Sequence, residues 1–265
     1  MCKLLGISRS YYYKLLKLQN AVNKITQREE QVSTRIIDIW ESSKMMYGSR
    51  KISAILKKEG INLSRYQVLR LMKKLGISSL YNKNTKFKPY KCKSHITQNG
   101  ENLLNQEFYI WTEREVLTSD LTYVKCADKF GYVCFVLDLF NREIVACNVS
   151  LSHDATFVLE TLNQINISKT HIFHSARGTE FVNQQIDKLL EDNGVTRSLS
   201  KTGCPFDNAV SENLFGLFKR EWAKERYSTL EELKNDVDDF VHNYNNFRVH
   251  SKLSYMSPVE YRLSV

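Results

Sequence analysis

Two carboxylates and a lysine have the types and the spacing that chemistry on a phosphate group requires. Asp120 lies in the middle of an apolar run, where a charge is unfavourable unless it meets a cation. Glu212 and Lys219 are seven residues apart, so on a helix they share one face, and Asn208 joins them one turn earlier. A divalent metal ion held by such carboxylates can activate water or a DNA 3′-hydroxyl and stabilise a pentacoordinate phosphate. Glu212 alone is more simply a surface residue in a salt bridge, and only the joint pattern indicates a site.

The elements that must position these residues follow from the hydrophobic pattern of the second half of the chain. The expected strands are 115–125, 132–138, 144–149, 170–174 and 196–199. The expected helices are 154–165, 180–192 and 208–224. This order predicts an α/β sheet domain. On the last helix we expect a buried face opposite Glu212 that carries Val210, Leu214, Leu217 and Trp222.

Charge divides unevenly along the chain. Residues 1–100 hold 21 Lys and Arg against 5 Asp and Glu, a net +16, whereas residues 101–265 hold 17 against 24, a net −7. A strongly basic region gains affinity for a phosphate backbone by releasing condensed counterions. The alternative, a charge surplus that only aids solubility, is the weaker explanation at this density. The front half is therefore expected to bind nucleic acid.

Residues 49–76 have the pattern of two short helices around a tight turn. Ser49 and Ser64 are the expected N-caps, and the helices are expected to end at Gly60 and Gly76. The second helix would expose side chains able to reach phosphates and base edges, namely Arg65, Tyr66, Gln67 and Arg70. An ordinary helical hairpin with solvated cations is the alternative, and the basic charge favours a helix-turn-helix that binds DNA.

The segments on either side of this pair are less regular. Residues 1–20 have the pattern of the second half of another helix-turn-helix, with Ser8 as the N-cap, and a further helix is expected at 26–43. The full helix-turn-helix domain is placed at 21–78. Residues 79–107 are predicted to be a basic linker, in which aromatic residues separate Lys83, Lys86 and Lys88. It either follows a nucleic-acid backbone or is only a flexible tether.

The cysteine pattern and the hydropathy of the sequence indicate the cellular compartment. The six cysteines form no CxxC pair, so free thiols in a reducing compartment are expected. No run approaches the 18 or more apolar residues of a membrane span. No signal-peptide pattern opens the chain. We therefore expect a cytoplasmic protein without a membrane partner.

Seven motifs in this order resemble those of the insertion sequence three family of transposases, of the OrfB type. They are Tyr47-Gly48-x-Arg50 with Val68-x-x-Leu71-Met72, Trp111, Asp120-Leu121-Thr122-Tyr123, Asp138-Leu139-Phe140-x-Arg142, His174-Ser175-Ala176-Arg177-Gly178, Asp207-Asn208-Ala209-x-x-Glu212 with Phe215 and Lys219, and Tyr244-Asn245-x-x-Arg248-x-His250 with Ser257-Pro258. Between Ala176 and Glu212 lie 35 residues, a spacing for which the family is known. Each motif is weak alone, and their order makes the resemblance specific.

The resemblance implies an RNase H-like, retroviral integrase-like catalytic domain at 108–227. An all-α helix-turn-helix region would precede it, and a C-terminal helical segment at 228–265 would follow. Asp120, position 176 and Glu212 would hold Mg²⁺ or Mn²⁺. Lys219 and Asn208 would position terminal nucleotides. Further DNA contacts are expected from Arg50, Lys51, Arg177, Arg248 and His250.

In the family, position 176 carries the second metal-binding aspartate, and this chain has Ala176. The metal is then expected to be absent or weakly bound. Either a decayed element copy or a deliberate replacement would explain the alanine. The expected function is binding of inverted-repeat ends with metal-dependent 3′-end cleavage and strand transfer, lost in this chain. The alternative is a non-catalytic repressor that occupies the ends.

A plain RNase H-type nuclease is disfavoured, because a non-specific nuclease needs no site-reading helix. The expected partners are the double-stranded DNA of the element ends and of the target. A homo-oligomer is also expected, because two ends must be brought together. An upstream reading frame fused ahead of Met1 stays an open alternative.

Overall fold

The structure is a computed structural model that describes residues 6–80, 102–108, 110 and 112–265. The side chains of residues 20–26 and 205 are not described. The expected contributions of Trp111, Lys83, Lys86 and Lys88 lie outside the described residues. The chain divides into two compact units, Met1–Lys86 and Phe87–Val265. The boundary falls inside the predicted linker.

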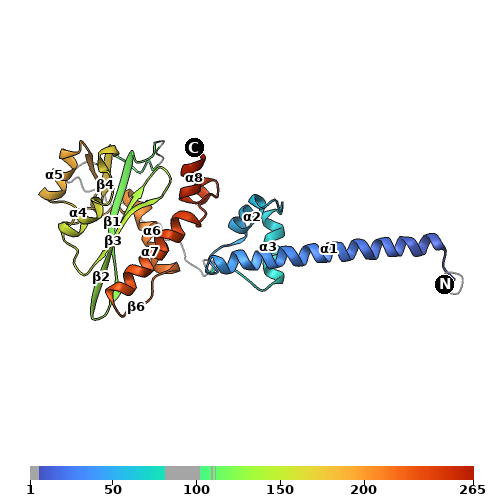
Figure 1. The fold of residues 1–265 in the computed structure, drawn as a ribbon. Helices are drawn as coiled ribbons and strands as arrows, with labels where there is room; N and C mark the ends of the chain where they lie inside the picture. The colour runs from blue at the N-terminus through green and yellow to red at the C-terminus, as the bar shows by residue number, and fades with distance from the viewer. Residues whose placement is uncertain (1–5, 81–101, 109, 111) are drawn as a thin grey trace. The chain divides into compact units, whose positions relative to one another are not determined.

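The first unit consists of three helices, α1 (Arg9–Ser42), α2 (Ser49–Lys58) and α3 (Arg65–Lys74) (Figure 1). Ser8 caps α1 by accepting from the backbone N–H of Tyr11. Ser64 caps α3 in a capping box with Gln67, as the sequence predicts. The expected cap of α2 is wrong by one residue. Gly48 is the N-cap and makes no side-chain bond, because Ser49 already has helical backbone.

A continuous α1 crosses the boundary expected between residues 20 and 21. Neither glycine nor proline occurs between Ser8 and Gly48, so nothing in this stretch breaks the helix. The helix predicted after Ser8 and the helix predicted at 26–43 are therefore one element. The three helices enclose a small core of Ile36, Ile39, Ile52, Leu56, Val68, Leu71 and Met72.

The second unit is built on a sheet in the order β3-β2-β1-β4-β5, with a short β6 (Arg226–Tyr227) at the end of β1. The long strands β1 (Val116–Cys126), β2 (Lys129–Asp138) and β3 (Ile144–Ser150) are antiparallel. The strands β4 (Ile172–Ser175) and β5 (Thr196–Leu199) run parallel to β1. The mixed α/β sheet agrees with the predicted fold class, and the sequence pattern did not indicate β6.

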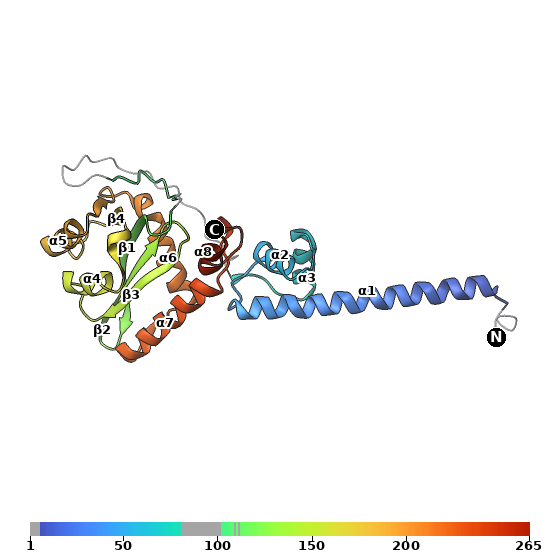
Figure 2. The same cartoon turned by 45° about the horizontal axis from the view of Figure 1, so that its top comes forward.

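Helices cover both faces of this sheet (Figures 1 and 2). One face packs on α4 (Ala155–Leu162) and α5 (Gln184–Asp192). The other packs on α6 (Ala209–Glu221) and α7 (Leu230–Asn246). Short 3₁₀ turns at Ile167–Lys169, Pro205–Asn208 (η3) and Ser251–Leu253 (η4) and a last helix, α8 (Pro258–Ser264), complete the unit.

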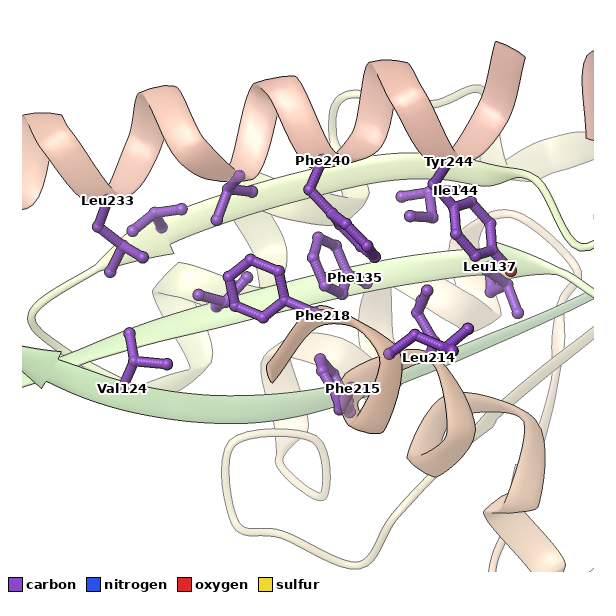
Figure 3. Close-up of a cluster of buried hydrophobic side chains, with 14 of the residues drawn as sticks. Val124, Phe135, Leu137, Ile144, Leu214, Phe215, Phe218, Leu233, Phe240 and Tyr244 are labelled. Carbon is purple, nitrogen blue, oxygen red and sulfur yellow. The ribbon is translucent and has the colours of Figure 1, made fainter. Parts of the chain in front are cut away.

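The largest apolar cluster lies between the sheet and the helix pair α6–α7 (Figure 3). Phe135 of β2 stacks on Phe215 of α6 at 5.5 Å and also meets Phe218 and Phe240 edge-on or tilted. Alternate residues of β1 share this face, since Val124 and Cys126 belong to the cluster whereas Leu117 and Leu121 pack on the opposite face. Asp120, an even-numbered residue of the same strand, therefore faces α6.

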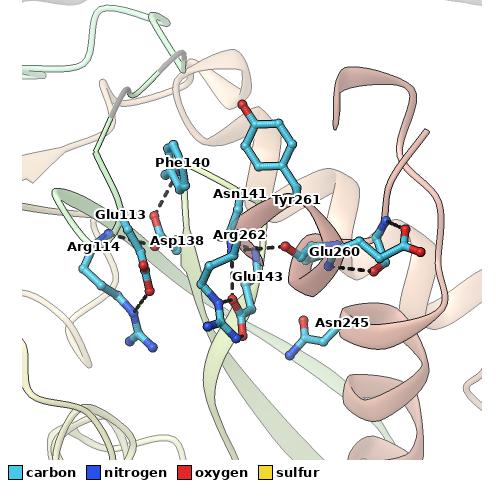
Figure 4. Close-up of polar contacts among 12 residues, drawn as sticks. Glu113, Arg114, Asp138, Phe140, Asn141, Glu143, Asn245, Glu260, Tyr261 and Arg262 are labelled. Carbon is cyan, nitrogen blue, oxygen red and sulfur yellow. Dashed lines mark hydrogen bonds and ion pairs between the residues drawn. The ribbon is translucent and has the colours of Figure 1, made fainter. Parts of the chain in front are cut away.

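The C-terminal segment belongs to the core unit rather than standing apart. Asn245 of α7 bonds both the N–H and the C=O of Ile144, and Arg262 of α8 reaches Glu143 at 2.9 Å (Figure 4). The Asp138 carboxylate accepts from the backbone N–H groups of Phe140 and Arg114. Asp138, at the end of β2, thus closes a turn.

Cys126, Cys134 and Cys147 are free thiols, and Cys204 is disulfide-bonded. The expectation of free thiols throughout is therefore wrong at Cys204. Spacing along the chain does not show which sulfurs the fold brings together, so the pattern could not indicate this bond. No helix among the described residues is long and apolar enough to cross a membrane.

Candidate active site

Asp120 is a half-buried carboxylate in the middle of β1. Its Oδ1 accepts from the backbone N–H of Leu121 at 2.9 Å, and its Oδ2 accepts from Asn208 Nδ2 at 2.9 Å. Burial first, and then the negative charges of Glu212 and Glu180, together raise the pKa of Asp120 to about 6. No cation among its interaction partners opposes this shift. The site therefore favours a protonated Asp120 or a bound positive charge.

Asn208 lies at the end of η3 and is buried, which differs from the exposed position expected beside Glu212 and Lys219. Its Nδ2 donates to Asp120, and its Oδ1 accepts from Thr118 Oγ1 at 3.1 Å. Thr118 in turn meets Ser211 Oγ of α6 at 3.1 Å. The α-helix begins only at Ala209, one residue later. The helical periodicity that predicts an exposed Asn208 therefore does not extend to that residue. Asn208 fixes the Asp120 carboxylate in this structure.

Strand register puts Ala176 beside Asp120. The strands β1 and β4 are parallel, with Thr118 opposite His174 and Ser119 opposite Ser175. β4 ends at Ser175, so Ala176 directly follows the last residue that pairs with β1, just as Asp120 directly follows Ser119, and the two residues leave the paired region at the same level of the sheet. A carboxylate at position 176 would thus stand next to Asp120, where the alanine supplies no ligand.

Glu180, which the sequence patterns did not single out, brings a further carboxylate to this region. A Cβ at Gly178 would collide with the Glu180 carboxylate, which folds back over that glycine. Glu180 is among the charges that raise the pKa of Asp120. Its signal in the sequence is weak, because a lone glutamate after a strand is ordinary; only the glycine two residues earlier permits this placement.

Glu212 and Lys219 are both exposed on α6, as the helical spacing predicts. Burial raises the pKa of Glu212 above its usual range. Lys219 Nζ stands 5.0 Å from the centre of the Tyr123 ring. The buried face of α6 consists of Ser211, Leu214, Phe215, Leu217 and Phe218, so the expected Val210 and Trp222 are only partly buried. Phe218 is the most buried residue of this face, and both phenylalanines pack against Phe135 of the sheet.

The His174-to-Gly178 motif has structural contacts of its own. His174 is buried between β4 and β5, with Nδ1 2.8 Å from Ser198 Oγ and Nε2 3.0 Å from Ser200 Oγ. Burial lowers its pKa to about 4, so the ring is neutral at pH 7. Arg177 Nε donates to the Ser200 carbonyl at 2.7 Å. These bonds hold the end of β4, and with it position 176, against the end of β5.

Arg248 is also buried rather than exposed for DNA. It makes a two-pronged ion pair with Glu221 at the end of α6, and both side chains are at most one tenth exposed. His250 meets the Tyr244 ring edge-on, with ring centres 4.9 Å apart. The DNA contact at Arg248 stays a prediction, whereas in the structure the side chain is paired with Glu221, which lies 27 residues earlier in the sequence.

The α3 surface keeps most of its predicted side chains in solvent. Arg65, Tyr66 and Arg70 are exposed, and the Tyr66 ring is 77% accessible. Gln67 is exposed but accepts from the Ser64 N–H, so its amide oxygen serves the capping box. Arg50 is exposed on α2. Lys51 is only half-exposed and covers the Tyr47 ring at 4.4 Å.

Among the described residues, no three His, Cys, Asp or Glu side chains are gathered as they would be around a metal ion. Asp120 and Glu212 offer the hard carboxylate oxygens that Mg²⁺ prefers, and Ala176 offers none. The residues present therefore fit two of the three ligand positions of a carboxylate metal site.

Family comparisons agree with this architecture. Residues 27–85 match the HTH-like domain, and residues 112–205 and 212–265 match two models that are each described as an integrase core domain. The two core matches cover the sheet, α6, α7 and α8. They include Asp120, Ala176 and Glu212.

Relatives match over most of their length. An uncharacterized transposase-like protein of Haemophilus influenzae is 30% identical over 211 residues, which are 77% of this chain and 95% of that protein. The transposase InsF for insertion sequence IS3A of Escherichia coli is 24% identical over 267 residues, 98% of this chain and 92% of that one. Among solved structures, the HTLV-2 integrase catalytic core domain in complex with magnesium is 13% identical, with 56% of this chain and 95% of that chain covered and a TM-score of 0.41.

Proposed function

This chain belongs to the insertion sequence three family of transposases, with an HTH-like domain and an integrase core, and from that premise we propose that it binds the terminal inverted repeats of an insertion sequence. We propose further that the fold supports metal-dependent 3′-end cleavage and strand transfer, and that Ala176 disables both steps in this chain. The observation that supports this proposal is the bond from Asn208, just before α6, to Asp120 on β1, together with the pairing of β1 and β4 up to Ser119 and Ser175, next to Asp120 and Ala176.

Each residue has a stated task in this proposal. Asp120 and Glu212 would hold the divalent metal, which when bound activates the attacking hydroxyl group and stabilises the phosphate in the transition state. Asn208 orients the Asp120 carboxylate. Lys219, exposed on the Glu212 face, would pair with a phosphate of the terminal nucleotides. His174 and Arg177 keep the end of β4 in position.

Recognition of the ends is assigned to α3, with Arg65, Tyr66 and Arg70 toward the DNA. These side chains are exposed and the first 100 residues carry a net +16, which supports a surface for a phosphate backbone. We also propose that the active assembly is a homo-oligomer, because two element ends must be joined to one target.

Ala176 favours a second candidate function. A chain that binds ends but lacks one metal ligand would occupy the ends and exclude active copies, as a non-catalytic repressor does. The same alanine that argues against catalysis leaves the binding surface of α3 untouched, since position 176 lies in the other unit.

The test is a strand-transfer assay on DNA that carries the inverted repeats flanking the coding sequence, with Mg²⁺ or Mn²⁺. This chain should bind the DNA without cutting or joining it, and Ala176→Asp should restore joining by at least about 10- to 100-fold, the size of even second-shell effects on metal sites. Adding Asp120→Asn to the revertant is the control and should abolish the gain.

Efficient joining by the alanine form would refute the role of position 176. A revertant that folds and binds the ends but stays silent would favour the repressor function.

A further inference from the structure

Four aromatic side chains form an exposed row on the hairpin of β1 and β2, and we call them the aromatic patch. Tyr123 is directly opposite Tyr132 across the two strands, and Phe130 lies two residues before Tyr132. Such positions share one face of a sheet. The fourth ring is His153, between β3 and α4. Tyr123 is 56% exposed and Phe130 is 45% exposed.

The rings of the aromatic patch contact one another in a chain. Tyr123 meets Phe130 edge-on, with ring centres 5.1 Å apart, and its centre is 6.5 Å from that of Tyr132. Tyr132 stacks on His153 at 4.4 Å. None of the four belongs to the two apolar clusters that cover the faces of the sheet. Single exposed apolar side chains are ordinary, whereas a contiguous group indicates a binding surface.

Two lysines lie beside these rings. Lys125 is directly opposite Phe130 and exposed, and within the described part of the chain it makes no ion pair or side-chain hydrogen bond. Lys219 Nζ lies 5.0 Å from the centre of the Tyr123 ring. No described strand pairs with this edge of β1 between Ser119 and Lys125, which leaves the ring open to Lys219 of α6.

Two acidic residues lie nearby, and each already has a partner. Asp128, in the turn of the hairpin, pairs with Arg226 at 2.9 Å. Asp154, next to His153, caps α4 by accepting from the backbone N–H of Phe157 at 3.0 Å. The surroundings of the aromatic patch therefore offer positive charge, and rings together with cations suit the bases and phosphates of a nucleic acid.

The aromatic patch is joined to the carboxylates through both β1 and α6. Tyr123 follows Asp120 by three residues, which is about 10 Å along a strand. Lys219 follows Glu212 by seven residues, which is about 10 Å along a helix. Glu212 acts on the pKa of Asp120 at one end of this stretch, and Lys219 contacts Tyr123 at the other. The strand and the helix therefore run side by side from the carboxylates to the aromatic patch.

We propose that the aromatic patch binds unpaired bases of the DNA on which the carboxylates act. Tyr123 and Phe130 stack on the bases, and Lys125 and Lys219 meet the phosphates. Successive nucleotides of one strand are about 3.4 Å apart, so about 10 Å places these bases roughly three nucleotides from the reacting phosphate. Rings on adjacent strands of a sheet can stack on single-stranded nucleic acid, whereas a duplex shows them no open base faces.

This inference rests on the proposed function as a protein that binds DNA ends, and its test separates the two. The probes are duplexes of the flanking inverted repeat, either blunt or extended on one strand by four unpaired thymidines, at the 3′ or the 5′ end. The full chain is used with Ala176 unchanged, so that the DNA stays intact. By fluorescence anisotropy, at least one extended end should bind about tenfold more tightly than the blunt end, near the low end of what stacking of one base contributes.

Paired substitutions test the rings. Tyr123→Ala with Phe130→Ala should reduce the preference for the extended end to less than about twofold and keep the affinity for blunt duplex. Tyr123→Trp, which retains a ring, should keep the preference. Phe247→Ala is the matched control, because Phe247 is a 63% exposed ring at the end of α7. Melting temperatures of all variants show that they are folded.

The face of the hairpin is tested by charge and by crosslinking. Lys125→Glu should weaken binding of the extended end more than Lys129→Glu, an equal charge change on the same hairpin, because Lys129 alternates with Phe130 and so belongs to the other face. In the parent, 5-iodo-2′-deoxyuridine in the unpaired segment should crosslink to the peptide that carries Tyr123 or to the one that carries Phe130.

Equal affinity of the parent for blunt and extended ends overturns the inference and leaves the proposed function intact. So does a crosslink confined to other peptides, an equal effect of the two lysine changes, or a folded double-alanine variant that keeps the preference. A double-alanine variant that changes only the oligomeric state would instead assign the aromatic patch to a second copy of the chain. Failure to bind any of these duplexes removes the proposed function and this inference with it.

Discussion

The α3 surface and the carboxylate site hold their charges in opposite surroundings. Arg65 and Arg70 extend into solvent from a helix whose buried face is Val68, Leu71 and Met72. Asp120 is half-buried in a sheet, with neighbouring negative charges that raise its pKa. Hydrated cations gain binding free energy when they displace the counterions that are condensed on DNA. Desolvated carboxylates gain it when a metal ion arrives. The arginines of α3 thus lose water only when DNA binds, whereas Asp120 already loses water when the protein folds.

Two arginines, one in each unit, sharpen this comparison, because their surroundings differ. Arg65 is solvated, whereas Arg248 is buried against Glu221. Sequence motifs assigned both to DNA. Burial separates them, and the consequences should differ in kind: one substitution should change affinity and the other should change stability.

The largest effect is expected for Arg248→Ala. Removing one partner of a buried ion pair leaves Glu221 uncompensated, which costs about 3–5 kcal/mol of unfolding free energy. Chemical denaturation measures this loss. The double change Arg248→Met with Glu221→Leu should recover most of it, because no buried charge remains. A variant of unchanged stability that loses DNA affinity would return Arg248 to the DNA interface.

The next effect is expected for Arg65→Ala combined with Arg70→Ala. Affinity for duplex DNA should fall by about 1–3 kcal/mol, and the slope of log affinity against log salt should flatten by about 2, because two phosphate or base contacts are lost. Anisotropy titrations across salt concentrations give both values. Lys57→Ala with Lys58→Ala, at the end of α2, is the control with the same charge change. If both pairs weaken binding equally, the effect is net charge and α3 has no special part.

A smaller effect concerns pH. The folded pKa of Asp120, about 6, lies above its value in the unfolded chain, so the folded state holds the proton more tightly. Stability therefore falls as pH rises from about 4 through about 6. Glu180→Gln should lower the pKa of Asp120 and add about 0.5–1 kcal/mol of stability at pH 7. Carboxyl NMR titration and denaturation at pH 5 and 7 test this, with Glu191→Gln on α5 as the control. A Glu180→Gln variant with an unchanged Asp120 titration would place Glu180 too far away to matter.

The smallest change in stability is expected for Lys219→Ala. The lysine is exposed and its contact with Tyr123 contributes only about 0.5–1 kcal/mol. Crosslinking to terminal nucleotides should nevertheless drop, while Lys188→Ala on α5 should change neither quantity. A large fall in melting temperature with unchanged DNA contacts would assign Lys219 to the fold.

The helical and strand patterns predicted the elements that local chemistry determines. The Ser64 capping box and the apolar run of β2 are readable from a few adjacent residues. The continuity of α1 was missed because a good N-cap at Ser8 suggested a separate unit. The helical face of α6 was only partly right, because Phe215 and Phe218 are drawn inward by Phe135, a residue 80 positions earlier.

Site geometry was less predictable, because it depends on pairs that are distant in the sequence. Asn208 was expected to face solvent, and its bond to Asp120 spans 88 positions. No periodic pattern in the sequence indicates the pairing of Arg248 with Glu221. The same is true of the placement of Glu180 over Gly178. Residue types indicate which side chains could take part in chemistry. Only the fold shows which of them are already bonded to other residues of the protein.

The Asn208–Asp120 bond makes three species compete for one oxygen. On the proposed function, a proton, the Asn208 amide and a metal ion would compete for the lone pairs of Asp120 Oδ2, and only the metal ion would support catalysis. Binding of an ion at Asp120 would then release a proton below about pH 6 and weaken the bond from the Asn208 amide. Because Asn208 also accepts from Thr118, and Thr118 meets Ser211, the start of α6 would register whether the ion has arrived. The position of α6, which carries Glu212, would thereby depend on whether an ion is bound at Asp120 of β1.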